Sequence, residues 1–130
     1  MIEVVLVALG GAVGACARFW LSGVVARRVG ETFPWGTLVV NVSGAIVIGV
    51  LAAVVLTSDG VVEAWREAWI VLVVGVLGSY TTVSSFSLQT LALARVGEYR
   101  HAAFNVLASL GLCLAGALAG HQAGLRLFGG

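Results

Sequence analysis

The chain has 130 residues, of which 60% are hydrophobic and only 10% are charged, and its formal net charge is +1. A soluble domain carries about 25% charged residues, so this composition argues against a soluble enzyme and against a disordered chain. The seven basic residues are all arginines and are dispersed, which argues against a nucleic-acid-binding face. The class that remains is a small integral membrane protein.

Four apolar stretches are long enough to cross a bilayer, whose core about 30 Å thick needs roughly 20 helical residues. The expected spans cover residues 4–25, 35–56, 68–94 and 102–120. We expect an all-α membrane protein in which residues 1–130 form a single domain of four transmembrane helices. The first stretch is expected to be a permanent span and not a signal peptide, because no basic residue precedes it.

The connections between spans carry a weak signal for orientation. The first and third connections hold four arginines, and the other side of the membrane holds two (Arg27, Arg28, Arg95 and Arg100 against Arg66 and Arg126). This bias favours a cytoplasmic location for the first and third connections. Because the bias is small, it is also compatible with insertion in both orientations, and therefore with an antiparallel dimer.

The first span contains Arg18, although a central arginine costs about 2.5–3.5 kcal/mol in a bilayer. No acidic residue lies inside any span to pair with it. Two interpretations stay open: Arg18 binds an anion in a polar vestibule, or it lies near the helix end and reaches the lipid headgroups. Nearby, Gly10, Gly11, Gly14 and Ala15 form a pattern of small residues that predicts close helix packing.

The second span contains Asn41, whose amide must find hydrogen-bonding partners because lipid offers none. The amide can donate two hydrogen bonds to an anion. It can equally bond to a neighbouring helix, and Asn41 alone does not decide between these roles.

The third span is the most informative, because residues 79–90 read SYTTVSSFSLQT and contain seven Ser or Thr. These hydroxyls cover more than one helical face, so lipid cannot surround the segment. Together with Gly75 and Gly78, they predict a helix break whose freed carbonyls need partners. Carbonyls suit a hard cation, and hydroxyl and amide protons suit an anion; the alternative is a polar helix interface without an ion.

Other residues add little evidence for chemistry. Val83 and Phe86 share a helix face, and an aromatic ring has an electropositive edge that can face an anion. The fourth span holds only Asn105 and Ser109 as strongly polar residues. We find no catalytic triad, clustered metal-binding motif or phosphate-binding loop, so we do not expect an enzyme.

Three segments together resemble the Fluc/CrcB family of small dual-topology fluoride channels: GGAVGACAR (10–18), PWGTLVVNVSGAIVIG (34–49) and GVLGSYTTVSSFS (75–87). The resemblance extends over all four spans. It implies a fluoride-selective channel of the cell (inner or plasma) membrane, assembled as an antiparallel homodimer among membrane lipids. Such a channel lets cytoplasmic fluoride leave down its electrochemical gradient and protects against fluoride toxicity.

The resemblance also implies roles for particular residues. The fluoride pore would involve Arg18, Asn41 and five residues of the third span (Thr82, Val83, Ser84, Ser85 and Phe86). A structural sodium ion would be held by the main-chain carbonyls of Gly78 and Thr81.

Two positions depart from the family pattern. The family usually reads TTFSTF where this chain reads TTVSSF, so Val83 replaces the first pore phenylalanine. Gln89 stands where the family often has glutamate. Three explanations stay open: a competent pore with one ring, a weakened channel, or one subunit of a heteromeric channel whose paralogous second chain supplies the ring.

Two other classes of membrane protein share some of these features. A small multidrug exporter also has four spans, but it needs a carboxylate within the membrane, and the only candidate, Glu3, lies at the start of the chain. A non-transporting membrane assembly protein is the other alternative. For a fluoride channel, the lack of a carboxylate in the spans favours passive conduction over proton-coupled exchange.

Overall fold

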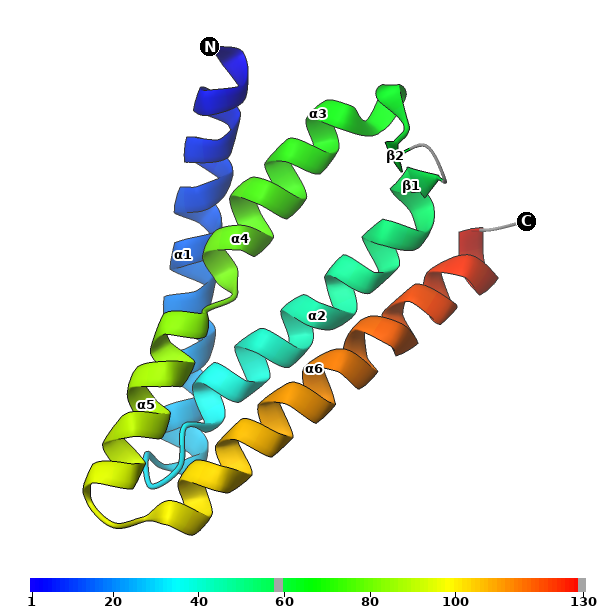
Figure 1. Cartoon of the computed structure of the whole chain (residues 1–130). Helices are drawn as coiled ribbons and strands as arrows, with labels where there is room; N and C mark the ends of the chain where they lie inside the picture. The colour runs from blue at the N-terminus through cyan, green and yellow to red at the C-terminus, as the bar shows by residue number, and fades with distance from the viewer. Residues whose placement is uncertain (58–59, 129–130) are drawn as a thin grey trace.

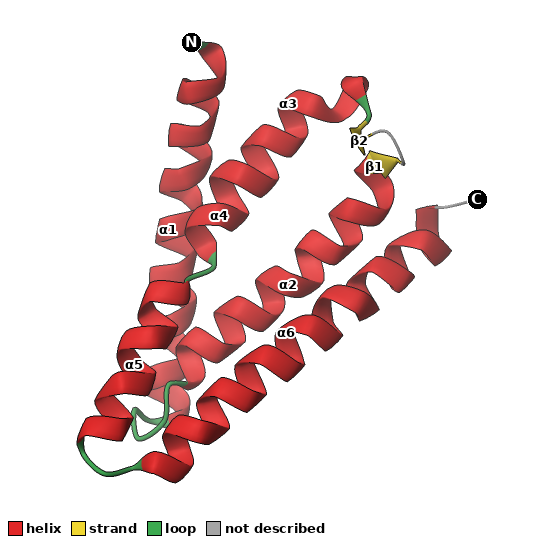
Figure 2. Cartoon of the chain, in the orientation of Figure 1, coloured by secondary structure: helices red, strands yellow, loops and turns green. Residues whose placement is uncertain are grey.

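The computed structural model describes residues 1–57 and 60–128, which form helices almost throughout (Figure 2). Four helical segments are long and apolar enough to cross a membrane. They are α1 (Ile2–Val29), α2 (Trp35–Val55), an interrupted third segment (Glu63–Arg95) and α6 (Tyr99–Phe128). The predicted all-α architecture with four spans is therefore confirmed over the described residues.

The helices α1 and α6 are longer than the sequence predicted, with 28 and 30 residues. At 1.5 Å per residue, α1 is about 42 Å long, which matches a bilayer with its headgroup layers. The predicted bounds of 4–25 and 102–120 were too short because they followed the apolar runs alone. The helices continue past the apolar runs to charged, exposed residues such as Glu3, Arg27 and Arg28, and Glu3 forms an ion pair with Arg66 at 2.8 Å.

The third span consists of several short helices, and the predicted break within it is confirmed. A 3₁₀ turn, η1 (Glu63–Trp65), leads through α3 (Arg66–Trp69) into wide π-helical turns, η2 (Ile70–Leu77). The span continues as α4 (Gly78–Tyr80) and α5 (Val83–Arg95). The two residues between α4 and α5 have extended backbone angles.

Two short strands lie in the second connection, for which no secondary structure was predicted from the sequence. Strand β1 (Leu56–Thr57) pairs antiparallel with β2 (Gly60–Val61), with Leu56 opposite Val61. The expected helical span to residue 56 was thus one residue too long. Next to β2, the N–H of Val62 donates to the carbonyl oxygen of Val55 at 3.1 Å, which gives a carbonyl at the end of α2 a partner.

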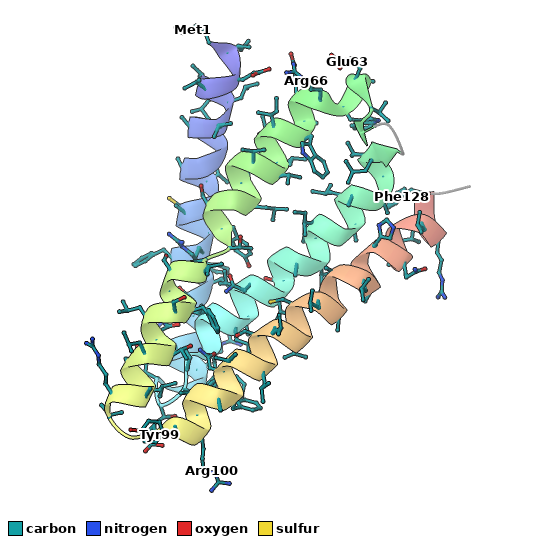
Figure 3. All side chains as sticks on the ribbon, viewed as in Figure 1. Met1, Glu63, Arg66, Tyr99, Arg100 and Phe128 are labelled. Carbon is teal, nitrogen blue, oxygen red and sulfur yellow. The ribbon has the colours of Figure 1, made fainter. Side chains whose placement is uncertain are left out.

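The helices form two pairs that meet at one end of the molecule. Figure 1 shows α2 and α6 side by side along their lengths, with α1 beside the first half of the third span. The connections at residues 30–34 and 96–98 lie at the end where the pairs meet. Figure 3 shows Arg100 at this end and Met1 and Arg66 at the opposite end, so the first and third connections share a side as predicted.

Glycines allow the helices of each pair to approach closely. A Cβ atom on Gly10 of α1 would lie 2.7 Å from the carbonyl oxygen of Val71 and 3.1 Å from the Cα atom of Gly75. Gly10 and Gly14 are both buried, which confirms the packing role predicted for them. Glycines at positions 49, 116, 120 and 124 serve the α2–α6 contact in the same way.

Candidate functional site

Thr81 and Thr82 interrupt the third span with extended backbone angles (φ −76°, ψ 155° and φ −151°, ψ 117°). The hydroxyl of Thr82 accepts a hydrogen bond of 3.1 Å from the backbone N–H of Ser85, and so caps the N-terminus of α5. The hydroxyl of Thr81 donates to the carbonyl oxygen of Leu77 at 2.9 Å. One threonine therefore ends the first half of the span, and the other begins the second half.

Asn41 on α2 bonds to the break from across the bundle. Its Nδ2 donates to the carbonyl oxygen of Thr82 at 2.9 Å, and its Oδ1 accepts from the N–H of Thr82 at 2.7 Å. Both main-chain groups of the buried Thr82 are thereby satisfied without a helical partner, as buried backbone requires. One amide proton of Asn41 is used in this pair, so one is left for an anion where the sequence suggested two.

The break removes the helical partners of the four carbonyl groups of residues 78–81, including those of Gly78 and Thr81. In a continuous helix, the carbonyl of Gly78 would accept from the N–H of Thr82, and that of Thr81 from the N–H of Ser85. Those two N–H groups donate instead to Asn41 Oδ1 and to Thr82 Oγ1. Gly78 and Thr81 are the two residues whose carbonyls were expected to hold sodium.

An apolar groove of about 590 Å³ lies between the break, α2 and α6, and we call it the central groove. It gathers six of the nine predicted site residues: Asn41, Gly78, Thr81, Thr82, Val83 and Phe86. Phe86 is half-buried there, whereas Val83 is 76% exposed. The position that usually carries a phenylalanine therefore has room for a larger side chain.

A second cavity of about 730 Å³ lies near the connection at residues 30–34, and we call it the loop-side cavity. Its lining includes Arg18, Thr82, Ser85 and Gln89. Arg18 is half-buried, and it forms no ion pair with any residue in 1–57 or 60–128. Thr82 lines both this cavity and the central groove, so both spaces border the break.

Ser84 lines neither cavity, unlike the other predicted pore residues. Its side chain is exposed, and its hydroxyl lies 3.1 Å from the hydroxyl of Thr82. Ser84 therefore reaches the site only through its hydrogen bond with Thr82.

Several polar contacts near the break were not predicted. Asn105 is only 2% exposed and donates to the hydroxyl of Thr90 at 2.8 Å, which donates in turn to the carbonyl oxygen of Phe86 at 2.7 Å. Gln89 Oε1 is the one buried side-chain polar atom in the described part of the chain without a hydrogen-bond partner. Asn105 and Gln89 could have been singled out in the sequence, because each places a side-chain amide within a membrane span.

Known proteins similar to this chain identify its family. Residues 5–121 match the family model described as "CrcB-like protein, Camphor Resistance (CrcB)". Among curated proteins, the chain is 55% identical over 112 residues to the fluoride-specific ion channel FluC 2 of Bradyrhizobium diazoefficiens, covering 86% of this chain and 81% of the relative. It is 60% identical to FluC 2 of Rhodopseudomonas palustris (83% and 82% covered) and 53% identical to FluC of Rhodospirillum rubrum (88% of each).

Proposed function

Because the chain belongs to the CrcB family of fluoride-specific ion channels, it is a fluoride channel of the cell membrane, and we propose that fluoride passes from the loop-side cavity to the central groove at Thr82. The observation that carries this path is that Thr82 lines both spaces. Asn41 holds the backbone of Thr82 at this junction. The protein is a transporter and not an enzyme.

The chemistry of the lining suits a small, strongly hydrated anion. A pore must replace the water around fluoride with other hydrogen-bond donors. The remaining amide proton of Asn41, the hydroxyl of Ser85 and the electropositive edge of Phe86 are such donors. Arg18 in the loop-side cavity attracts anions to the entrance.

Conduction through this path is passive, since no carboxylate lies among the proposed pore residues. The membrane potential then sets the direction of flow. One charge crossing 100 mV is worth about 2.3 kcal/mol, or roughly a fiftyfold concentration ratio. A negative cell interior therefore drives fluoride out and protects the cell from its toxicity.

A second copy of the chain, in antiparallel orientation, is proposed to cover the open side of the central groove. The groove is mainly apolar, and it is flanked by exposed Leu110 and Leu114 of α6. The small arginine bias allows the opposite insertion that such a dimer needs. The exposure of Val83 favours a second candidate, in which a paralogous chain covers the groove and supplies the missing phenylalanine ring.

A structural sodium ion fits the break. Sodium is a hard cation that prefers oxygen ligands, and carbonyl oxygens replace the hydration shell of such ions in channels. Gly78 and Thr81 line the central groove, and their carbonyls lack the N–H partners of a continuous helix. In a dimer across the groove, each subunit would contribute these two carbonyls.

The path is tested by fluoride efflux from liposomes, followed with a fluoride electrode. Phe86→Ile removes the ring edge in the groove and keeps an apolar side chain, and we expect efflux to fall by about tenfold, which corresponds to about 1.4 kcal/mol. Ser87→Ala alters an exposed residue of α5 that lines neither cavity and serves as the control. Equal efflux from the parent and Phe86→Ile would refute this path.

A further inference from the structure

A second polar contact ties the break to α2. The hydroxyl oxygens of Ser43 and Tyr80 lie 2.7 Å apart. The hydroxyl of Ser43 also donates to the carbonyl oxygen of Val40 at 3.0 Å. Because the single proton of Ser43 is used in that bond, the hydroxyl of Tyr80 is the donor in the contact between them.

Three consecutive residues at the break contact α2. Thr82 bonds to Asn41, and Tyr80 bonds to Ser43. Between them, the methyl group of Thr81 lies against Gly44, and a Cβ atom on Gly44 would also lie 3.3 Å from Cδ1 of Tyr80. Thr81 therefore has hydrogen bonds to α2 on both sides, one through Tyr80 and two through Thr82.

This contact is separate from the proposed fluoride path. Neither Ser43 nor Tyr80 lines the central groove or the loop-side cavity. Tyr80 ends α4, which has only three residues. Because α4 continues η2 without a gap, Tyr80 lies in the last turn of this half of the span, where a helix end frays unless other contacts hold it.

We propose that Ser43 and Tyr80 are positioning residues for the sodium site. Their hydrogen bond fixes the N-terminal side of the break on α2, while the Asn41–Thr82 pair fixes the C-terminal side. The carbonyls of Gly78 and Thr81 then keep their spacing before the ion arrives, and preorganised ligands bind more tightly than mobile ones. The inference rests on the sodium ion of the proposed function.

The test is thermal unfolding of the purified protein in detergent over a range of sodium chloride concentrations. Chloride is held constant with N-methylglucamine. Tyr80→Phe and Ser43→Ala each remove one hydroxyl, and we expect each to raise the sodium concentration for half-maximal stabilisation by about fivefold, as loss of one hydrogen bond implies. The double variant should need no more sodium than either single variant. Tyr99→Phe, at an exposed tyrosine of α6, should match the parent.

The possible failures are distinguishable. A lower melting temperature for Tyr80→Phe with an unchanged half-maximal sodium concentration would mean that the contact is only structural, and it would overturn the inference. A parent protein that conducts fluoride but shows no stabilisation by sodium would overturn the sodium site itself. Additive effects of Tyr80→Phe and Ser43→Ala on the sodium requirement would show that the two hydroxyls do not act as a pair.

Discussion

Asn41 and Thr82 are 41 residues apart in sequence, and two hydrogen bonds of 2.9 and 2.7 Å join the side-chain amide of one to the backbone of the other. The amide takes the place of the helical partners that Thr82 lacks. Asn41 thus shapes the break, and its remaining amide N–H donates a hydrogen bond to the anion in the proposed pore. A change at this position alters both properties.

Replacement of Asn41 by Asp should abolish most fluoride conduction. The carboxylate can still accept from the N–H of Thr82, but it cannot donate to the carbonyl oxygen, and its negative charge repels fluoride. We expect efflux to fall more than about tenfold, equivalent to at least 1.4 kcal/mol. The electrode assay measures this loss, and size-exclusion chromatography checks that assembly is unchanged. Parental efflux from Asn41→Asp would exclude Asn41 from the pore.

Replacement of Arg18 by Gln should slow the entry of fluoride in a salt-dependent way. At an ionic strength of about 10 mM the screening length is about 30 Å, so Arg18 acts on anions outside the cavity. We expect efflux several-fold below the parent at low ionic strength and little difference at about 1 M salt, where that length is about 3 Å. Arg28→Gln, at an exposed arginine that lines neither cavity, is the matched control. A deficit that does not change with salt would contradict an electrostatic role.

Asn105 and Thr90 should be energetically coupled, because a hydrogen bond of 2.8 Å joins them between α5 and α6. Hydrogen bonds between membrane helices average about 0.6 kcal/mol in double-mutant cycles and reach about 1.7. We expect a coupling energy in this range for Asn105→Ala and Thr90→Val, measured by unfolding in detergent. Thr90→Ser keeps the hydroxyl and should retain the coupling. Strictly additive losses would show that this bond does not stabilise the fold.

Gly120 on α6 should tolerate no larger side chain. A Cβ atom there would clash with the carbonyl oxygen of Ile46 and lie 3.2 Å from its Cα atom. We expect Gly120→Ala to lower the free energy of unfolding by about 1–3 kcal/mol, as overpacking does. Gly111 on the same helix has open space around it, so Gly111→Ala should be neutral or stabilise the helix by up to about 1 kcal/mol. Equal effects at the two positions would contradict the close α2–α6 contact.

The number of spans and the break could be predicted because each depends on local sequence. Four long apolar runs require four helices, and the hydroxyl-rich segment after Gly78 cannot lie in lipid as an ordinary helix. The helix ends were less predictable, because α1 continues past the apolar run through charged residues such as Arg27, which is exposed. The pairing of Leu56 with Val61 was not predicted, although Asp59-Gly60 in the sequence is a dipeptide typical of hairpin turns.

The hydrogen bonds of the site could not be predicted, because their partners are distant in sequence. The sequence indicates that Asn41 and Asn105 need partners, but nothing local points to Thr82 for the first or Thr90 for the second. The contact of Ser43 with Tyr80 depends on the close approach of the break at Gly44. Such pairings follow from helix packing and become visible only in three dimensions.

The most direct test of the account is fluoride efflux from liposomes that contain only this purified chain, driven by a potassium–valinomycin potential, with chloride measured in parallel. We expect rapid loss of fluoride and little loss of chloride, which would establish that copies of this chain alone form a complete channel with valine at position 83. No fluoride efflux from a well-folded dimer, with efflux gained by Val83→Phe or by a second chain that carries the phenylalanine, would contradict a self-sufficient homodimer.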